Sequence, residues 1–152
     1  MRGEAEKELS KKTVKAKYHH GDLREALVVA SYELIAQNGP EHFLLAEACR
    51  RAGVSTAAPY KQFRDRDEIL EVVVARAFDE LADRSMTAVA AGGVGTLNGI
   101  VAMGEAYVQF ATDEQHLFRL MFGQRPQNRL DEDDPDEGHR CFSGVIEQVA
   151  CY

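Results

Sequence analysis

The chain has 152 residues, with 18 Lys and Arg against 25 Asp and Glu and a formal net charge of -7. Its 45 % hydrophobic and 28 % charged residues are typical of a folded globular protein and exclude disorder over most of the chain. No apolar run approaches the roughly 20 residues that a membrane-spanning helix needs, and the charged N-terminus lacks the apolar stretch of a signal peptide. We therefore expect a cytoplasmic protein with no membrane partner.

The charge is unevenly distributed along the chain. Residues 1–66 contain 12 Lys and Arg and 9 Asp and Glu, a net charge of +3, whereas residues 67–152 contain 6 and 16, a net charge of -10. Lys and Arg drive binding to nucleic-acid phosphates, so the acidic total does not exclude a nucleic-acid partner for the N-terminal half. The asymmetry predicts a basic binding module joined to an acidic body.

The first expected elements are an arm and a helix. Residues 1–17 alternate Lys and Glu with few apolar side chains, which predicts a flexible basic arm that ends in Lys15 and Lys17. Asp22 can cap a helix whose apolar side chains recur with the 3.6-residue period, and Asn38-Gly39-Pro40 can end that helix.

Two shorter helices are expected next. The first covers residues 44–52 and stops at Gly53. Ser55 then offers an N-cap hydroxyl to a short helix over residues 56–63, with Pro59 near its first turn, where a missing amide donor costs least.

A capping box, Asp65 with Glu68, opens a long helix that runs to about Ala90 and is followed by a glycine turn at residues 92–95. Since no segment alternates apolar and polar residues as a strand does, we predict an all-α fold. The remaining expected elements are a helix over residues 96–112, a helix capped by Asp113 that ends at Phe122, an acidic loop at 131–137 and a helix over 138–150.

The two short helices joined by Gly53-Val54-Ser55 have the spacing of a helix-turn-helix, which places its second helix in the major groove of DNA. Small side chains allow close approach to bases, and Tyr60 can reach a phosphate. The spacing alone is equally typical of a tight corner between two helices of a bundle, but the basic arm and the charge gradient favour DNA. The candidate DNA-contacting residues are Lys15, Lys17, His19, Ser55, Thr56, Ala57, Ala58, Tyr60 and Lys61.

The residues around this pattern resemble those of the TetR family of transcriptional regulators, over about residues 18–80. A second resemblance, to a C-terminal domain class of the same family, covers residues 106–111 and 117–123. The N-terminal motifs are Tyr18-His19-His20-Gly21-Asp22-Leu23-Arg24, Gly39-Pro40, Arg50-Arg51-Ala52-Gly53-Val54-Ser55, Ala57-Ala58-Pro59-Tyr60 and Phe63.

The resemblance implies a three-helix helix-turn-helix domain over residues 18–66, joined by a long helix to a helical effector-binding and dimerisation domain over 67–152. It also implies a homodimeric repressor that binds a palindromic operator in double-stranded DNA and is released by a small-molecule effector. The chain ends at Tyr152, where family members usually continue through another long helix, so we expect the C-terminal domain and its dimer interface to be incomplete. Leu44, where the family usually has Ser or Thr, lacks a cap worth about 1 kcal/mol.

Aromatic and Met side chains of the C-terminal half either form the core or line an effector cavity. Such a cavity favours a small apolar or aromatic molecule, and Arg119 is the residue best suited to hold an anionic one. The candidate ligand-binding residues are Phe78, Met103, Tyr107, Phe110, Arg119, Met121 and Phe122.

Other chemistry is poorly supported by the sequence. Adjacent His19 and His20 lack further metal ligands, and the glycine turn at 92–95 lacks the Lys-Ser/Thr of a phosphate-binding loop. No serine lies in a nucleophile elbow, so we expect no catalysis, metal or cofactor. Cys49 is expected to be a small core residue. The alternative function is a helical protein-binding or scaffold module without DNA binding.

Overall fold

The structure is a computed structural model, and it describes residues 20–123 and 137–151. Over these two ranges the chain forms helices and no strand, which confirms the predicted all-α class. The elements, with η for a 3-10 helix, are α1 (His20–Asn38), η1 (Pro40–His42), α2 (Leu45–Arg51), η2 (Pro59–Lys61), α3 (Arg66–Gly92), α4 (Leu97–Asp113), α5 (Gln115–Phe122) and α6 (Glu137–Cys151).

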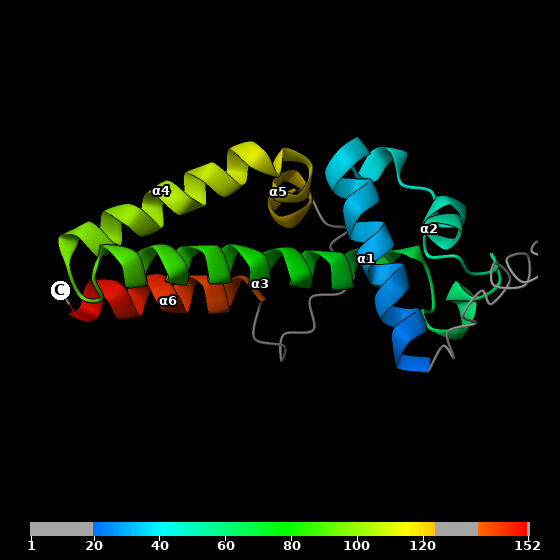
Figure 1. The fold of residues 1–152 in the computed structure, drawn as a ribbon, viewed down its shortest axis with the longest axis horizontal. Helices are drawn as coiled ribbons and strands as arrows, with labels where there is room; N and C mark the ends of the chain where they lie inside the picture. Colours follow the sequence, from blue (N-terminus) through cyan, green and yellow to red (C-terminus); the bar gives the residue numbers. More distant parts are fainter. Residues whose placement is uncertain (1–19, 124–136, 152) are drawn as a thin grey trace, which may run out of the picture.

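The long helix α3 forms the axis of the molecule (Figure 1). Helices α4 and α6 lie along its C-terminal part on different sides, and α1 crosses it near its N-terminal end. Helix α2 packs on α1, while α5 packs against α1, α3 and α4. The predicted basic arm and most of the predicted acidic loop lie outside the described residues. None of the described helices is long and apolar enough to cross a lipid bilayer.

The buried apolar side chains form a cluster that extends from α1 to α5. Burying one large apolar side chain contributes about 1.5–3 kcal/mol, so this cluster is the main source of stability. Cys49 is 1 % exposed within it, which confirms the predicted core cysteine, and this burial raises the pKa of its thiol. Fully buried members of the cluster include Leu27, Ile35, Ile69, Leu81, Phe110 and Leu117.

Capping residues define helix ends at three places, and two of them, Gly39 and Asp65, were predicted from the sequence. Gly39 follows α1 with a φ of 85°, a conformation that glycine adopts without the steric cost that a Cβ would impose. The Asp65 carboxylate accepts a hydrogen bond of 2.9 Å from the Glu68 N–H at the start of α3. The Thr96 hydroxyl accepts one of 3.1 Å from the Gly99 N–H at the start of α4. These bonds satisfy amides that have no partner inside the helix.

Two predicted caps are wrong. Asp22 lies inside α1, because the helical backbone continues upstream to His20. Asp113 is the last residue of α4, and its carboxylate accepts a hydrogen bond of 2.7 Å from Gln109 Nε2. That bond lies within α4, so the carboxylate does not cap α5; Glu114 precedes α5 without a side-chain cap.

Candidate functional site

The chain leaves α2 through a glycine cap. The Val54 N–H donates to the Cys49 carbonyl over 2.9 Å, and the Gly53 N–H donates to the Arg50 carbonyl over 3.2 Å. This pair of bonds is the Schellman motif, which needs a left-handed residue just after the helix. Gly53 has φ of 70°, as the motif requires. The predicted helix end is therefore confirmed, and the cap fixes the direction of the chain after α2.

The expected α-helix over residues 56–63 is wrong. Residues 56–58 form a turn that leads into the one-turn 3-10 helix η2. Pro59 has no N–H to donate to the Ser55 carbonyl, and this carbonyl instead accepts from the Ala58 N–H over 3.0 Å. The resulting three-residue spacing is that of a 3-10 turn, so Pro59 converts the start of the expected helix into a tighter turn.

The turn holds most of its predicted DNA-contacting side chains outward. Pro59 and Phe63 are buried and fix the segment to the core. Tyr60 is 72 % exposed, an unusual state for a large aromatic side chain, and Ala58 is partly buried. The exposed members are Ser55, Thr56, Ala57, Tyr60 and Lys61. The remaining three candidates, Lys15, Lys17 and His19, lie outside the described residues.

Exposed arginines border this turn, and we did not single them out as candidates from the sequence. Arg50 is paired with Glu47 over 3.0 Å within α2. Arg64, just after η2, bonds Glu68, and the Arg64 backbone N–H also donates to Glu68 over 2.7 Å. Exposed pairs of this kind contribute about 0–1 kcal/mol, so each guanidinium can exchange its carboxylate for a phosphate at little cost. Arg50 belongs to the motif at residues 50–55 that resembles the TetR family, so the sequence could have suggested it as a candidate.

The aromatic candidates for effector binding form a row of ring contacts. Phe78 on α3 meets Phe122 on α5 edge to face, with ring centroids 5.5 Å apart. Phe118, which the sequence did not suggest, lies 4.7 Å from Phe122 and 5.6 Å from Tyr107 on α4. We call these four residues the aromatic row. Phe78 is buried at one end, whereas Tyr107 and Phe122 are 38 % and 47 % exposed.

The other ligand-binding candidates do not share one surface. Phe110 and Met121 belong to the buried cluster, and Met103 is also buried. Arg119 is exposed on α5, so the expectation that it supplies a buried positive charge for an anionic effector is wrong. It lies midway between buried Leu117 and Met121, which occupy the opposite face of the helix.

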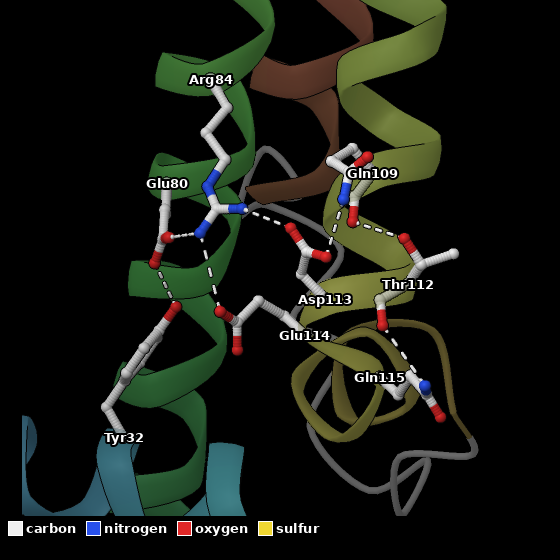
Figure 2. Close-up of polar contacts among 8 residues, drawn as sticks. All are labelled: Tyr32, Glu80, Arg84, Gln109, Thr112, Asp113, Glu114 and Gln115. Atoms are coloured by element: carbon white, nitrogen blue, oxygen red, sulfur yellow. Dashed lines mark hydrogen bonds and ion pairs between the residues drawn. The ribbon is translucent and has the colours of Figure 1, made fainter.

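Arg84 on α3 is a partly buried arginine that sequence reasoning missed. Figure 2 shows its guanidinium between Glu80 and the end of α4. Arg84 Nη2 donates to Glu80 Oε1 and lies 3.6 Å from Glu114 Oε1, while Nη1 lies 3.8 Å from Asp113 Oδ2. Its guanidinium also covers the ring of Phe110, at 5.2 Å from the centroid. Glu80 and Arg84 are four residues apart on α3, but no local sequence pattern joins them to Asp113, Glu114 or Phe110, which come from other parts of the chain.

The same cluster reaches α1 through Tyr32. The Tyr32 hydroxyl donates to Glu80 Oε2, the second oxygen of the carboxylate that Arg84 holds (Figure 2). Burial and this bond to a charged acceptor raise the pKa of Tyr32 far above its ordinary value. Burial lowers the pKa of Arg84, but its bond to Glu80 and the nearby carboxylates outweigh burial and give a net rise. Tyr32 therefore stays a neutral donor and Arg84 a cation.

Comparison with known proteins identifies a similar fold without a function. The chain is similar to the structure of a protein of unknown function from Rhodococcus sp. RHA1, with 28 % sequence identity and a TM-score of 0.63. The match covers 90 % of this chain and 66 % of that one, so this chain spans just under two thirds of that protein's length. No family model and no curated protein matches the chain.

Proposed function

We propose that the chain is a cytoplasmic DNA-binding transcriptional regulator of TetR type. In this proposal α1, α2 and the turn that ends in η2 act as the helix-turn-helix domain, and residues 55–61 contact duplex DNA. The observation that carries the proposal is the exposed turn after α2, which is held by a glycine cap on one side and by buried Pro59 and Phe63 on the other. A fixed, outward turn of small side chains suits close approach to a groove.

The chemistry of the turn divides between bases and phosphates. Thr56 and Ala57 are short enough for the backbone to approach base edges, and the Ala57 methyl can contact a thymine methyl. Tyr60 and Lys61 extend further and suit phosphate oxygens, which fix the position of a protein without reading sequence. Few side chains here can make paired hydrogen bonds to one base, so DNA shape and bridging water carry part of the specificity.

The regulator acts as a homodimeric repressor in this proposal. Two copies place their turns in successive major grooves about 34 Å apart on a palindromic operator. A small apolar or aromatic effector bound at the exposed rings of the aromatic row releases the repressor, because it favours a conformer in which the two turns no longer match that spacing. The exposed rings of Tyr107 and Phe122 support this effector class.

The experiment that tests DNA binding is fluorescence anisotropy with duplex DNA from upstream of the protein's own gene, titrated at several salt concentrations. The logarithm of the affinity should fall linearly with the logarithm of salt concentration. Lys61→Ala should reduce that slope by about 1. Arg119→Ala, which removes an exposed cation from α5, is the matched control and should leave the slope unchanged.

Two outcomes would contradict the proposal. The first is a dimer, verified by sedimentation, that shows no saturable binding to this DNA or to a random-sequence duplex library at low salt. The second is an equal fall in slope for Lys61→Ala and Arg119→Ala, which would assign the affinity to overall charge and not to the turn.

A specific surface feature favours the second candidate, a helical protein-binding module. Apolar side chains are exposed at four-residue spacing on α4, at Leu97 and Val101, and again at Val108, while Ile146 and Val149 are exposed on α6. The spacing places the three α4 side chains on one face of that helix, and exposed apolar surface of this kind marks interaction sites. Val101→Asp should abolish partner binding if this surface carries the function and should leave the affinity of the turn for DNA unchanged.

A further inference from the structure

A chain of polar contacts joins α1 to the boundary between α4 and α5. It runs from the Tyr32 hydroxyl through Glu80 and Arg84 to Asp113 and Glu114 (Figure 2). Both carboxylate oxygens of Glu80 are used, one toward α1 and one toward Arg84. We call these five residues the Arg84 relay. A change in the position of Arg84 therefore acts on the acceptor of the Tyr32 hydroxyl.

The two ends of the relay differ in how firmly they are held. Arg84 makes a hydrogen bond to Glu80, whereas its distances to Asp113 and Glu114, 3.8 and 3.6 Å, are those of looser ion pairs. Asp113 is also held within α4 by Gln109. One guanidinium thus faces three carboxylates. When the α4–α5 boundary moves, the guanidinium can shift its ion pairing from Asp113 to Glu114 or back.

The far end of the relay is attached to the turn that we propose contacts DNA. Arg51 at the end of α2 bonds Glu33 of α1 over 3.2 Å and Gln37 of α1 over 3.1 Å. Residues of α1 and α2 also share the buried cluster. The glycine cap at Gly53 then fixes the turn to α2. A tilt of α1 on α3 therefore carries α2 and the turn with it.

We propose that the Arg84 relay couples the position of the α4–α5 boundary to the tilt of α1 on α3. Arg84 is a positioning residue in this arrangement. The consequence for DNA affinity rests on the proposed function, but the coupling is a property of the folded chain and is measurable without DNA. The effector-responsive end would be the α4–α5 boundary, next to the Tyr107 and Phe118 end of the aromatic row.

A second arginine of α3 gives the comparison that the proposal needs. Arg76 pairs with Glu25 of α1 and its guanidinium lies 5.9 Å from the ring centroid of Tyr32. It thus holds α1 on α3 without using Asp113 or Glu114. Loss of Arg76 should weaken the packing of α1 on α3. Loss of Arg84 should in addition make the tilt of α1 independent of the position of the α4–α5 boundary.

The first test is a double-mutant cycle between the two ends of the relay, which do not bond each other. The variants are Tyr32→Phe, Asp113→Asn and their combination, and the measurement is the unfolding equilibrium constant in urea. We expect the combined effect to differ from the product of the single effects by about threefold or more, because coupled residues are not additive. Glu33→Gln with Asp113→Asn is the control pair on the same two helices, and it should be additive within about twofold.

The second test measures the geometry directly. Spin labels are placed at Ala46→Cys on α2 and Asn98→Cys on α4, both exposed, in a background where Cys141→Ser and Cys151→Ser leave buried Cys49 as the remaining native thiol. In this background Arg84→Gln and Tyr32→Phe should shift or broaden the distance distribution between the labels. Arg119→Gln should leave it unchanged. Tyr32→Phe is the conservative variant, so the result does not depend on whether the Arg84 variant folds.

Additivity in the Tyr32 and Asp113 cycle, together with an unchanged distance distribution in Tyr32→Phe, would overturn the proposal. DNA titration of the same labelled protein separates the two inferences. Coupling without saturable DNA binding would leave the relay standing and refute the regulator. DNA binding without coupling would refute the relay alone.

Discussion

The Val54 N–H donates a hydrogen bond to the Cys49 carbonyl across the single left-handed residue Gly53. This hydrogen bond ties the exposed turn at residues 55–58 to the core, because Cys49 is a core residue and Val54 packs partly against the core. The direction of residues 55–58 is therefore set by the core of the N-terminal helices and not by the exposed side chains of the turn. This cap therefore determines where the proposed DNA-contacting residues lie.

Gly53→Ala should destabilise the protein by about 1 kcal/mol. The space around Gly53 does not oppose the change, since an added Cβ would meet no atom within 4 Å. The penalty comes from the backbone, because a left-handed conformation costs a residue with a Cβ about 1–2 kcal/mol. Urea denaturation monitored by circular dichroism measures the difference in unfolding free energy.

Gly104→Ala is the matched control for that substitution. Gly104 lies inside α4, and an added Cβ there also meets no atom within 4 Å. Its backbone is helical, so alanine should stabilise the protein by about 0.5–1 kcal/mol. A loss of similar size at both positions would show that the left-handed backbone is not what Gly53 supplies.

Leu44→Ser should stabilise the protein by about 1 kcal/mol. Leu44 precedes α2 with the extended backbone of an N-cap, but it makes no side-chain cap bond and is 65 % exposed. Serine there would form a capping box with Glu47, three residues further on. Thermal unfolding compares Leu44→Ser with Leu44→Ala, which removes the same exposed side chain without adding an acceptor. Equal stability of the two variants would exclude the cap as the cause.

The sequence was sufficient where a structural signal is local. Gly39 and Gly53 ended their helices, Asp65 opened α3, and Cys49 was buried as its place in an apolar stripe indicated. Each of these features depends on a few neighbouring residues and on backbone rules that hold in any fold. The all-α class followed from the same periodicity.

The sequence failed where distant residues decide. Tyr32 and Glu80 are 48 residues apart, and although Glu80 and Arg84 have the i,i+4 spacing of a helix, no periodicity relates this pair to Tyr32, Asp113 or Glu114. Arg119 was proposed for its charge, but the sequence did not show which face of α5 packs on the core. The structure buries Leu117 and Met121 and leaves Arg119 exposed. Pro59 was expected in an α-helix over residues 56–63 but lies in η2, because its missing N–H leaves the Ser55 carbonyl to the Ala58 N–H and tightens the turn. The function of the turn stays a prediction.

The stability of the protein should fall on the acid side through Glu68. The backbone N–H of Arg64 donates to this carboxylate, and the Arg64 guanidinium adds to that bond, so the pKa of Glu68 lies below its usual value of 4.5. The folded state therefore prefers the charged form. Its contribution is complete above pH 4.5 and is lost as the pH falls through the lowered pKa.

Glu68→Gln checks this assignment, since glutamine cannot titrate. The unfolding free energy of the wild-type protein should decline between pH 5 and pH 3 more steeply than that of the variant, and the two curves should converge at the acid end. Asp67→Asn, on the preceding residue of the same helix turn, is the control and should keep the wild-type slope. Parallel curves for wild-type protein and Glu68→Gln would contradict the assignment.

Substitution should separate the aromatic effector candidates into core and surface. Phe110 is fully buried beneath Arg84, so Phe110→Ala should lower the unfolding free energy by about 3–5 kcal/mol. Phe122 is 47 % exposed and makes edge contacts with Phe78 and Phe118, so Phe122→Ala should cost about 1–2 kcal/mol. If the exposed rings of the aromatic row, Tyr107 and Phe122, bind the effector, Phe122→Ala should also abolish the thermal stabilisation that a neutral aromatic probe such as indole gives the wild-type protein. Leu97→Ala, at another exposed apolar site, should retain that stabilisation, and its loss in both variants would assign the probe to general apolar surface instead of the row.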